Sequence, residues 1–281
     1  MSDETQKPLP PSAVPDFSML RGTGKLRVIV TRPISQALPW IETLRSHGIE
    51  AYPVPLIDIE PATDSAPVVQ VWQDLKEFAL VMFVSANAVQ QFFALRPLET
   101  VWPLSALAAS TGPGTTAALQ QAGLRGAMIV EPVPGAGYDS EALWARLRSR
   151  DWTGSRVLIV RGEDGREWLA DQFRSGGAVV QTVAAYRRVA PVHGPETLAV
   201  LDESVADPSS FCWLFTSSEA IGHLVELTPK ADWSSSKALV THLRIAHAAR
   251  AAGFGDVHLM DAQPMAVVAT IRQIQHLPRL V

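Results

Sequence analysis

Two similar segments, about 130 residues apart, constrain the fold of this chain more than any other feature of its sequence. Ser155–Pro191 contains an apolar run, a short polar loop, a helical segment that ends at a Gly-Gly pair, and a second apolar run. This order is typical of a strand, a helix and a second strand, which together form a βαβ unit. Leu26–Pro61 has the same order, and a shift of 129 residues aligns Arg32 with Arg161 and Gly48 with Gly177.

The similarity continues beyond these two segments. Val84–Val89 resembles Thr216–Ile221 at a shift of 132 residues, and Thr115–Gly123 resembles Ile245–Gly253 at a shift of 130. Matches in the same order at a nearly constant shift predict an internal duplication, with one half at about 26–147 and the other at about 155–274. Solenoid repeats have periods of roughly 20–50 residues, so we interpret this one as a duplicated domain.

Length and composition agree with two globular domains. A chain of 281 residues with 47% hydrophobic and 19% charged residues can bury a sizeable core. The net charge of −4 provides no general attraction to nucleic acid or to an anionic membrane, so any anion site must be local. We find no basic stripe with aromatic residues, no signal peptide and no apolar run of about 20 residues, and therefore expect a cytoplasmic protein.

Two further parts of the chain are expected to carry no chemistry. Residues 1–24 are rich in proline and poor in periodic apolar positions, which predicts a disordered tail. Cys212, the only cysteine, lies in an apolar run and is interpreted as a buried core thiol.

Short apolar strands alternate with amphipathic helices along both halves, and this alternation predicts a doubly wound α/β fold with parallel sheets covered on both faces. The predicted strands are 26–31, 50–56, 79–84, 104–110, 127–130, 157–160, 178–185, 211–216, 237–240 and 257–260. The predicted helices are 38–47, 68–78, 88–95, 115–121, 140–148, 168–174, 219–227, 245–252 and 265–274.

Ligands of such folds bind outside the carboxyl ends of the strands, so the polar residues that follow each strand are the candidate site. They offer hydroxyls, guanidinium groups and helix N-termini, which together suit the binding of several carboxylates or phosphates. Two alternatives stay open: the hydroxyl residues only cap helices, and the arginines are solvated loop charges. The candidates are Thr31-Arg32, Ser85-Asn87, Ser110–Gly114, Arg161-Gly162-Arg166, Thr216–Ser218 and Thr241–Arg244.

Other chemistries are not supported by the motifs. Gly112-Pro113-Gly114 is no dinucleotide fingerprint, there is no Walker loop, and no Cys/His set has the spacing of metal ligands. His242 and His247 are five residues apart and do not share a helical face. No pair of nucleophile and base stands out, so the protein either only binds a ligand or catalyses a reaction that mainly requires a substrate held in one geometry.

An ordered set of motifs, spread over about 26–274, is similar to the uroporphyrinogen-III synthase family. No single motif is diagnostic, and the order of the whole set carries the resemblance. The motifs are TRP at 31–33, VSANAV at 84–89, GPGTTAAL at 112–119, DSEAL at 139–143, VRGEDGRE…GG…AYRR at 160–188, TSSEAI at 216–221 and HLRIA…GF at 242–254.

The resemblance implies an enzyme of haem biosynthesis that acts on a linear tetrapyrrole. Members of the family are cyclising hydro-lyases: they remove the terminal hydroxyl of hydroxymethylbilane as water, invert the last pyrrole ring and close the macrocycle, without metal or organic cofactor. The substrate carries eight carboxylates, which agrees with the anion-binding groups expected above. A monomer is expected. The alternative is a non-catalytic two-domain binder or sensor of a polyanionic small molecule.

The resemblance also implies an exchange between the two halves of the duplication. One flavodoxin-like domain is expected from 26–56 plus 190–276, and the other from 61–184. The crossings at 56–61 and 185–191 are expected to form a two-stranded linker, with the active site in the cleft between the domains.

The same resemblance implies roles for individual residues. Tyr186 matches the tyrosine suggested as the acid that helps the hydroxyl leave, and the alternative for it is a packed aromatic with a satisfied hydroxyl. Some relatives have Gly-Pro-Thr-Thr where this chain has His242–Ile245, so contacts there are expected to be ionic or through backbone N–H groups. The residues implied to bind substrate are Thr31, Arg32, Ser85, Asn87, Arg161, Gly162, Arg166, Ser217, Ser218, Thr241, Arg244 and Ile245.

Overall fold

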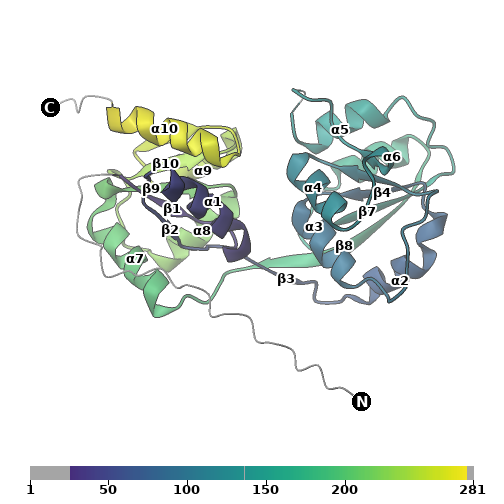
Figure 1. Ribbon diagram of the computed structural model, residues 1–281, viewed down its shortest axis with the longest axis horizontal. Coiled ribbons are helices and arrows are strands. Elements are labelled where there is room, and N and C mark those ends of the chain that lie inside the picture. Colours follow the sequence, from purple (N-terminus) through teal and green to yellow (C-terminus); the bar gives the residue numbers. More distant parts are fainter. Residues whose placement is uncertain (1–25, 136, 277–281) are drawn as a thin grey trace, which may run out of the picture. The chain divides into compact units, whose positions relative to one another are not determined.

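The computed structural model describes residues 26–135 and 137–276, and it is an α/β protein in which the strands of each sheet are mainly parallel (Figure 1). The predicted α/β class with parallel sheets is therefore confirmed. The described residues divide into two compact units: unit 1 comprises 26–56 and 191–276, and unit 2 comprises 57–135 and 137–190. The tail expected at 1–24 lies outside the described residues.

Unit 1 is built around a five-stranded sheet in the order β11-β10-β9-β1-β2, in which every pairing is parallel. Helices α1 and α10 pack together on one face and contribute Ala37, Leu44, Val267 and Ile271 to the core. Its strands are β1 (Arg27–Val30), β2 (Ala51–Pro53), β9 (Phe211–Phe215), β10 (Lys237–Val240) and β11 (Asp256–Leu259). Its helices are α1 (Ile34–Ser46), α7 (Pro195–Ala206), α8 (Ser218–Leu227), α9 (Leu243–Ala251) and α10 (Pro264–His276).

Unit 2 is built around a six-stranded sheet in the order β3-β8-β7-β4-β5-β6, in which only the β3–β8 pairing is antiparallel. Helices α2, α3 and α4 cover one face, and α5 and α6 cover the other. Its strands are β3 (Asp58–Pro61), β4 (Leu80–Phe83), β5 (Leu107–Ser110), β6 (Ile129–Val130), β7 (Arg156–Gly162) and β8 (Val179–Val189). Its helices are α2 (Ala66–Asp74), α3 (Ala86–Ala94), α4 (Pro113–Gln121), α5 (Ser140–Leu147) and α6 (Trp168–Ser175).

The central strands are buried along their whole length, and apart from Arg27 at the start of β1 they are apolar, because helices cover both faces of each sheet. All residues of β1, β4 and β9 are buried. Cys212 lies in β9 and is fully buried, as predicted, and this burial raises the pKa of its thiol well above the usual range. In the part of the chain that the structure describes, no helix is both long enough and apolar enough to cross a membrane.

Most predicted elements are present, with ends that differ by at most four residues. Helix α1 starts at Ile34 instead of residue 38 and contains Pro39. Helix α5 is capped by Asp139, whose carboxylate accepts the backbone N–H of Ala142 at 2.8 Å. Helix α7, strand β3 and the one-turn 3₁₀ helices Gly126–Met128 and Pro208–Ser210 were missed.

Strand β8 is longer than predicted because it has partners on both sides. It pairs in parallel with β7 up to Tyr186, and from Tyr186 to Val189 it pairs antiparallel with β3. If β8 were paired only with β7, it would end where β7 ends. It continues beyond that point because β3 pairs with it.

Candidate active site

The carboxyl ends of adjacent strands β1, β9 and β10 bring together polar residues of unit 1. Val30 pairs with Leu214, and Phe215 pairs with Val240, so the residues that follow these strands lie at one edge of the sheet. This edge therefore unites six of the predicted substrate-binding residues, which are Thr31, Arg32, Ser217, Ser218, Thr241 and Arg244.

Arg32 is a cation at this edge whose guanidinium group has a hydrogen-bond donor that the described part of the protein does not use. Its Nη2 donates to Oε1 of Gln36 at 2.8 Å, and its guanidinium lies 5.1 Å from the ring centre of Trp40. Among the described residues it has no acidic partner, and its buried Nε has no acceptor. Burial lowers the pKa of the Arg32 guanidinium by desolvation. An anion bound here would satisfy Nε and compensate the desolvation of the cation.

The hydroxyl groups at the same edge differ in whether they already form hydrogen bonds within the protein. Thr31 is buried and donates its hydroxyl to the carbonyl oxygen of Leu214 at 2.7 Å, so its proton is committed within the sheet. Ser217 caps α8 by accepting the N–H of Glu219 at 3.2 Å. Ser218, the first residue of α8, has a buried Oγ with no partner among the described residues.

The start of α9 borders an open surface pocket of about 510 Å³. His242 caps α9 by accepting the N–H of Arg244 at its Nδ1 (3.1 Å). Arg244 is exposed, whereas Ile245 is buried and donates its N–H to the backbone carbonyl oxygen of His242. Arg244 is thus the better placed of the two for a ligand. The pocket is lined by Thr241, His242, Leu243, Leu259, Met260 and Asp261.

The carboxyl ends of β4, β7 and β8 bring together a second set of predicted residues in unit 2. Ser85 follows β4 and caps α3, accepting the N–H of Ala88 at 3.2 Å. Its Oγ lies 3.2 Å from the hydroxyl oxygen of Tyr186 on β8. Asn87 lies half-buried in the first turn of α3. This edge therefore collects a serine, an amide and a phenol.

Tyr186 is buried, with only 1% of its surface exposed, and glycine makes room for its ring. Gly162 pairs with Tyr186 across a β-bulge, and a Cβ at position 162 would lie 3.0 Å from two ring carbons of Tyr186. Nη2 of Arg188 donates to the phenol oxygen at 3.1 Å. Gly162 was predicted as a substrate contact. In the structure, its lack of a side chain leaves space for the phenol ring of Tyr186.

The two predicted arginines of unit 2 are paired with acids. Arg161 contacts Oε1 of Glu167 at 2.5 Å and donates to the carbonyl oxygen of Gly165 at 2.7 Å. Arg166 is exposed and lies 3.3 Å from Oε1 of Glu141. Both guanidinium groups hold the loop between β7 and α6, so a substrate carboxylate would have to compete with these acids.

The predictions missed one residue with polar contacts at the site, Arg188. Alternation along β8 is the signal for Arg188, because residues two apart on a strand point to the same side and Tyr186 was already a candidate.

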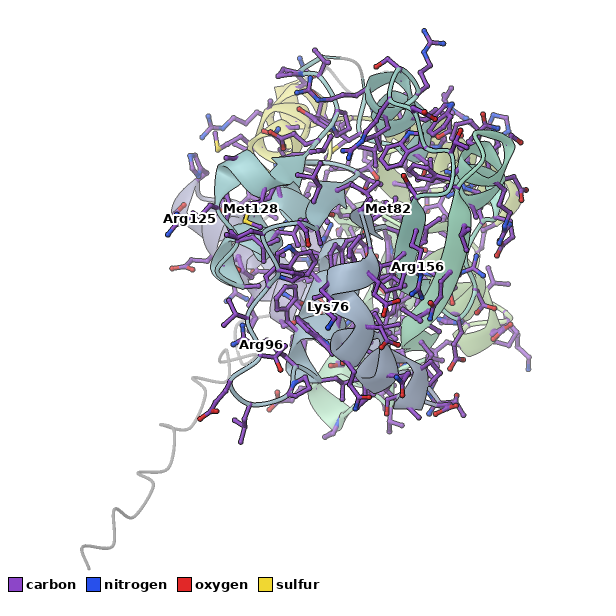
Figure 2. The ribbon with its side chains drawn as sticks, turned by 90° about the vertical axis from the view of Figure 1, so that its right-hand side faces the viewer. Lys76, Met82, Arg96, Arg125, Met128 and Arg156 are labelled. Atoms are coloured by element: carbon purple, nitrogen blue, oxygen red, sulfur yellow. The ribbon has the colours of Figure 1, made fainter. Side chains whose placement is uncertain are left out.

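Further cations of unit 2 lie at the opposite edge of its sheet (Figure 2). Arg156 starts β7, Lys76 and Arg125 precede β4 and β6, and Arg96 follows α3, so all four are at the amino-terminal ends of the strands. Arg156 is ion-paired with Glu77. These cations are a strand length away from Ser85 and Tyr186, and they do not belong to the candidate site.

The sequence matches a family model described as "Uroporphyrinogen-III synthase HemD" over residues 39–264. The uroporphyrinogen-III synthase of Salmonella typhimurium is 28% identical over 243 residues, covering 84% of this chain and 95% of the relative. The enzyme of that name from Escherichia coli has the same identity and coverage. The one from Chlorobaculum parvum is 26% identical over 223 residues, covering 74% of this chain and 82% of the relative.

Solved structures are similar in fold. A mutant uroporphyrinogen III synthase from the extremely thermophilic bacterium Thermus thermophilus superimposes with a TM-score of 0.57 at 17% identity, covering 90% of this chain and 100% of that one. A uroporphyrinogen-III synthetase from Helicobacter pylori gives a TM-score of 0.54 at 14% identity, covering 89% and 99%.

Proposed function

The chain belongs to the uroporphyrinogen-III synthase family, and from this premise we propose that it cyclises hydroxymethylbilane to uroporphyrinogen III, with inversion of the terminal pyrrole ring and loss of water. The observation that carries the proposal is the extent of the family match, since residues 39–264 span both units. The polar carboxyl edge of each sheet supports it independently, because such edges are where α/β folds bind ligands.

The groups at these edges suit a substrate with eight carboxylates. In unit 1, Arg32 offers a desolvated guanidinium without an acid partner among the described residues, and Ser218 offers an unpaired hydroxyl. Arg244 adds an exposed cation at the start of α9. Ionic hydrogen bonds of this kind are stronger than neutral ones and hold a polyanion in one orientation.

Orientation is the main requirement of the proposed reaction. The hydroxyl leaves readily from an electron-rich pyrrole, and spontaneous closure produces the uninverted isomer. The enzyme must therefore direct attack to the other carbon of the terminal ring, and holding reactants in one geometry can supply roughly 7–11 kcal/mol. Tyr186 is proposed as the source of the proton, or of the hydrogen bond, that helps the hydroxyl leave.

The two units are further proposed to descend from one duplicated domain, with the first βα unit of each half exchanged. The strand orders support this: β2-β1-β9-β10-β11 in unit 1 corresponds to β8-β7-β4-β5-β6 in unit 2. Matched glycines support it as well. Gly48 and Gly177 have φ of 75° and 84°, and Gly123 and Gly253 have φ of 99° and 96°.

Product analysis tests the proposed activity. Hydroxymethylbilane is generated in situ with and without the protein, oxidised to porphyrin and separated by chromatography. We expect type III porphyrin to predominate with the protein and type I without it. Type I alone, formed at the uncatalysed rate, would contradict the proposal, and tetrapyrrole binding under the same conditions would then indicate a non-catalytic binder.

A further inference from the structure

The hydroxyl of Tyr186 lies between Arg188 and Ser85, and the direction of its first hydrogen bond follows from chemistry alone. Nη2 of Arg188 lies 3.1 Å from the phenol oxygen. A guanidinium group has donors and no acceptor. The phenol oxygen therefore accepts this bond, and its own proton points elsewhere.

The direction of the second hydrogen bond follows from burial. Ser85 Oγ lies 3.2 Å from the phenol oxygen. If Ser85 donated, the phenol proton would have no acceptor among the described residues, although Tyr186 is only 1% exposed. A buried donor without an acceptor is costly, so Tyr186 donates to Ser85.

Ser85 then has a proton of its own to give. Its Oγ accepts from the phenol of Tyr186 and from the backbone N–H of Ala88 at 3.2 Å, and these two bonds occupy both of its lone pairs. Its residue is half-buried, in contrast to Tyr186, and it lies at the carboxyl end of β4 before α3. Of the two hydroxyl residues, Ser85 is thus the more exposed, and its proton is the one that the hydrogen bonds within the protein leave available for a ligand.

We propose that Ser85 is the catalytic residue that touches the leaving hydroxyl, and that Tyr186 and Arg188 are positioning residues that act through it. The inference rests on the proposed function. As the C–O bond of the hydroxymethyl group breaks, its electron pair stays on oxygen, which takes the Ser85 proton and leaves as water. Ser85 takes the Tyr186 proton, and the guanidinium of Arg188 stabilises the phenolate. The proton lost from carbon after ring closure restores the chain.

The surroundings of Tyr186 support a fixed geometry for this chain. The Arg188 guanidinium carbon lies 5.4 Å from the ring centre, and the ring lies against Gly162, where a Cβ would approach two ring carbons to 3.0 Å. The backbone carbonyl of Tyr186 also accepts the N–H of Glu163 at 2.9 Å. The ring of Tyr186 is therefore held in place by its own backbone in the sheet, by Gly162 at the β-bulge and by the guanidinium group of Arg188.

Kinetics of single and double variants test the proposal. General acids typically contribute between about 10²-fold and 10⁴-fold, so Ser85→Ala should lower kcat by about 100-fold or more and change KM by less than about threefold. Tyr186→Phe should lower kcat by more than about twofold. Because the tyrosine acts through the serine, adding Tyr186→Phe to Ser85→Ala should cause no further loss. If the losses in kcat of the two single variants multiply in the double variant, the proposal is overturned, because Ser85 and Tyr186 would then contact the substrate independently.

Two conservative variants separate chemistry from folding. Ser85→Asn keeps an N-cap for α3 but has no hydroxyl to pass on a proton, so it should fold like the wild type and be as slow as Ser85→Ala. Arg188→Lys keeps a donor and a charge and should retain most of the kcat that Arg188→Met loses. A fast Ser85→Asn enzyme would contradict the role of the serine, and equal losses in both Arg188 variants would contradict that of the cation.

A measurement without substrate distinguishes failure of this inference from failure of the proposed function. In protein with labelled tyrosine rings, the Tyr186 hydroxyl proton is identified by NMR through its loss in Tyr186→Phe. We expect slow exchange with solvent and a nuclear Overhauser contact to Ser85, with faster exchange in Ser85→Ala. If the Tyr186 hydroxyl proton exchanges equally fast in the wild type and in Ser85→Ala, the proposed chain of hydrogen bonds is overturned, whichever isomer the protein produces.

Discussion

Arg32 and Arg161 occupy matched positions in the two halves of the sequence, yet their side chains have different partners. Arg161 is held by Glu167 and by the carbonyl oxygen of Gly165. Arg32 has an amide and an aromatic ring beside it and, among the described residues, no acid. Of the two guanidinium groups, only that of Arg32 can bind a carboxylate without first giving up an ion pair.

This difference predicts unequal effects of the same substitution. Arg32→Met should raise KM by about tenfold or more, because a hydrogen bond to a charged group contributes roughly 1.5–3 kcal/mol and about 1.4 kcal/mol corresponds to tenfold in affinity. Arg161→Met is the matched control and should change KM by less than about threefold. Steady-state kinetics of both variants provide the comparison, and equal effects would contradict the assignment.

How far the candidate site can be predicted depends on which property of a residue is asked for. Parallel strands place their following residues at one edge, so the positions of Arg32, Ser85 and Ser217 follow from the alternation of strands and helices. The partners of a side chain do not follow, because they come from other elements. The ion pair of Arg161 and the bond from Arg188 to Tyr186 depend on loop and strand geometry that sequence spacing does not reveal.

The turn that ends helix α6 depends on one of its two glycines. Gly177 has a φ of 84°, and a Cβ there would lie 3.2 Å from Cα of Thr153, whereas Gly176 has a φ of −81° and its nearest neighbour would be the carbonyl oxygen of Phe173 at 3.4 Å. The left-handed conformation costs a residue with a Cβ roughly 1–2 kcal/mol.

Gly177→Ala should therefore lower the free energy of unfolding by at least about 1–2 kcal/mol, since the close contact with Thr153 adds to the backbone strain. Gly176→Ala should change it by less than about 0.5 kcal/mol, as a substitution away from such features does. Urea denaturation followed by circular dichroism measures both. A larger loss in Gly176→Ala than in Gly177→Ala would contradict this account of the turn.

At the level of elements, hydrophobic periodicity predicted most strands and helices but missed α7 and β3. Helix α7 starts with Pro195 at its first turn after Gly194, which is a helix-start signal, and a shift of about 130 residues places it on α2. The duplication would therefore have revealed it. Strand β3 is short and has no buried residue, and it exists because β8 provides a partner, which a local pattern cannot show.

At the level of the whole molecule, the alternation of strands and helices along the sequence predicts parallel sheets, and the structure confirms them. The alternation does not determine which strands are neighbours in a sheet. In unit 1, β1 pairs with β9, whose sequence is about 180 residues away. Such pairings arise from the packing of all helices on both faces, and expectations about them came from the family resemblance instead of from the periodicity of the chain.

The central claim is that this chain directs closure of hydroxymethylbilane against the spontaneous reaction, and the isomer fraction as a function of protein concentration tests it most directly. With the tetrapyrrole generated at a constant rate, the fraction of type III product should rise with protein concentration and saturate near completeness. Tyr186→Phe should require more protein, in proportion to its loss in kcat/KM. A fraction of type III that does not depend on the concentration of wild-type protein would contradict the account.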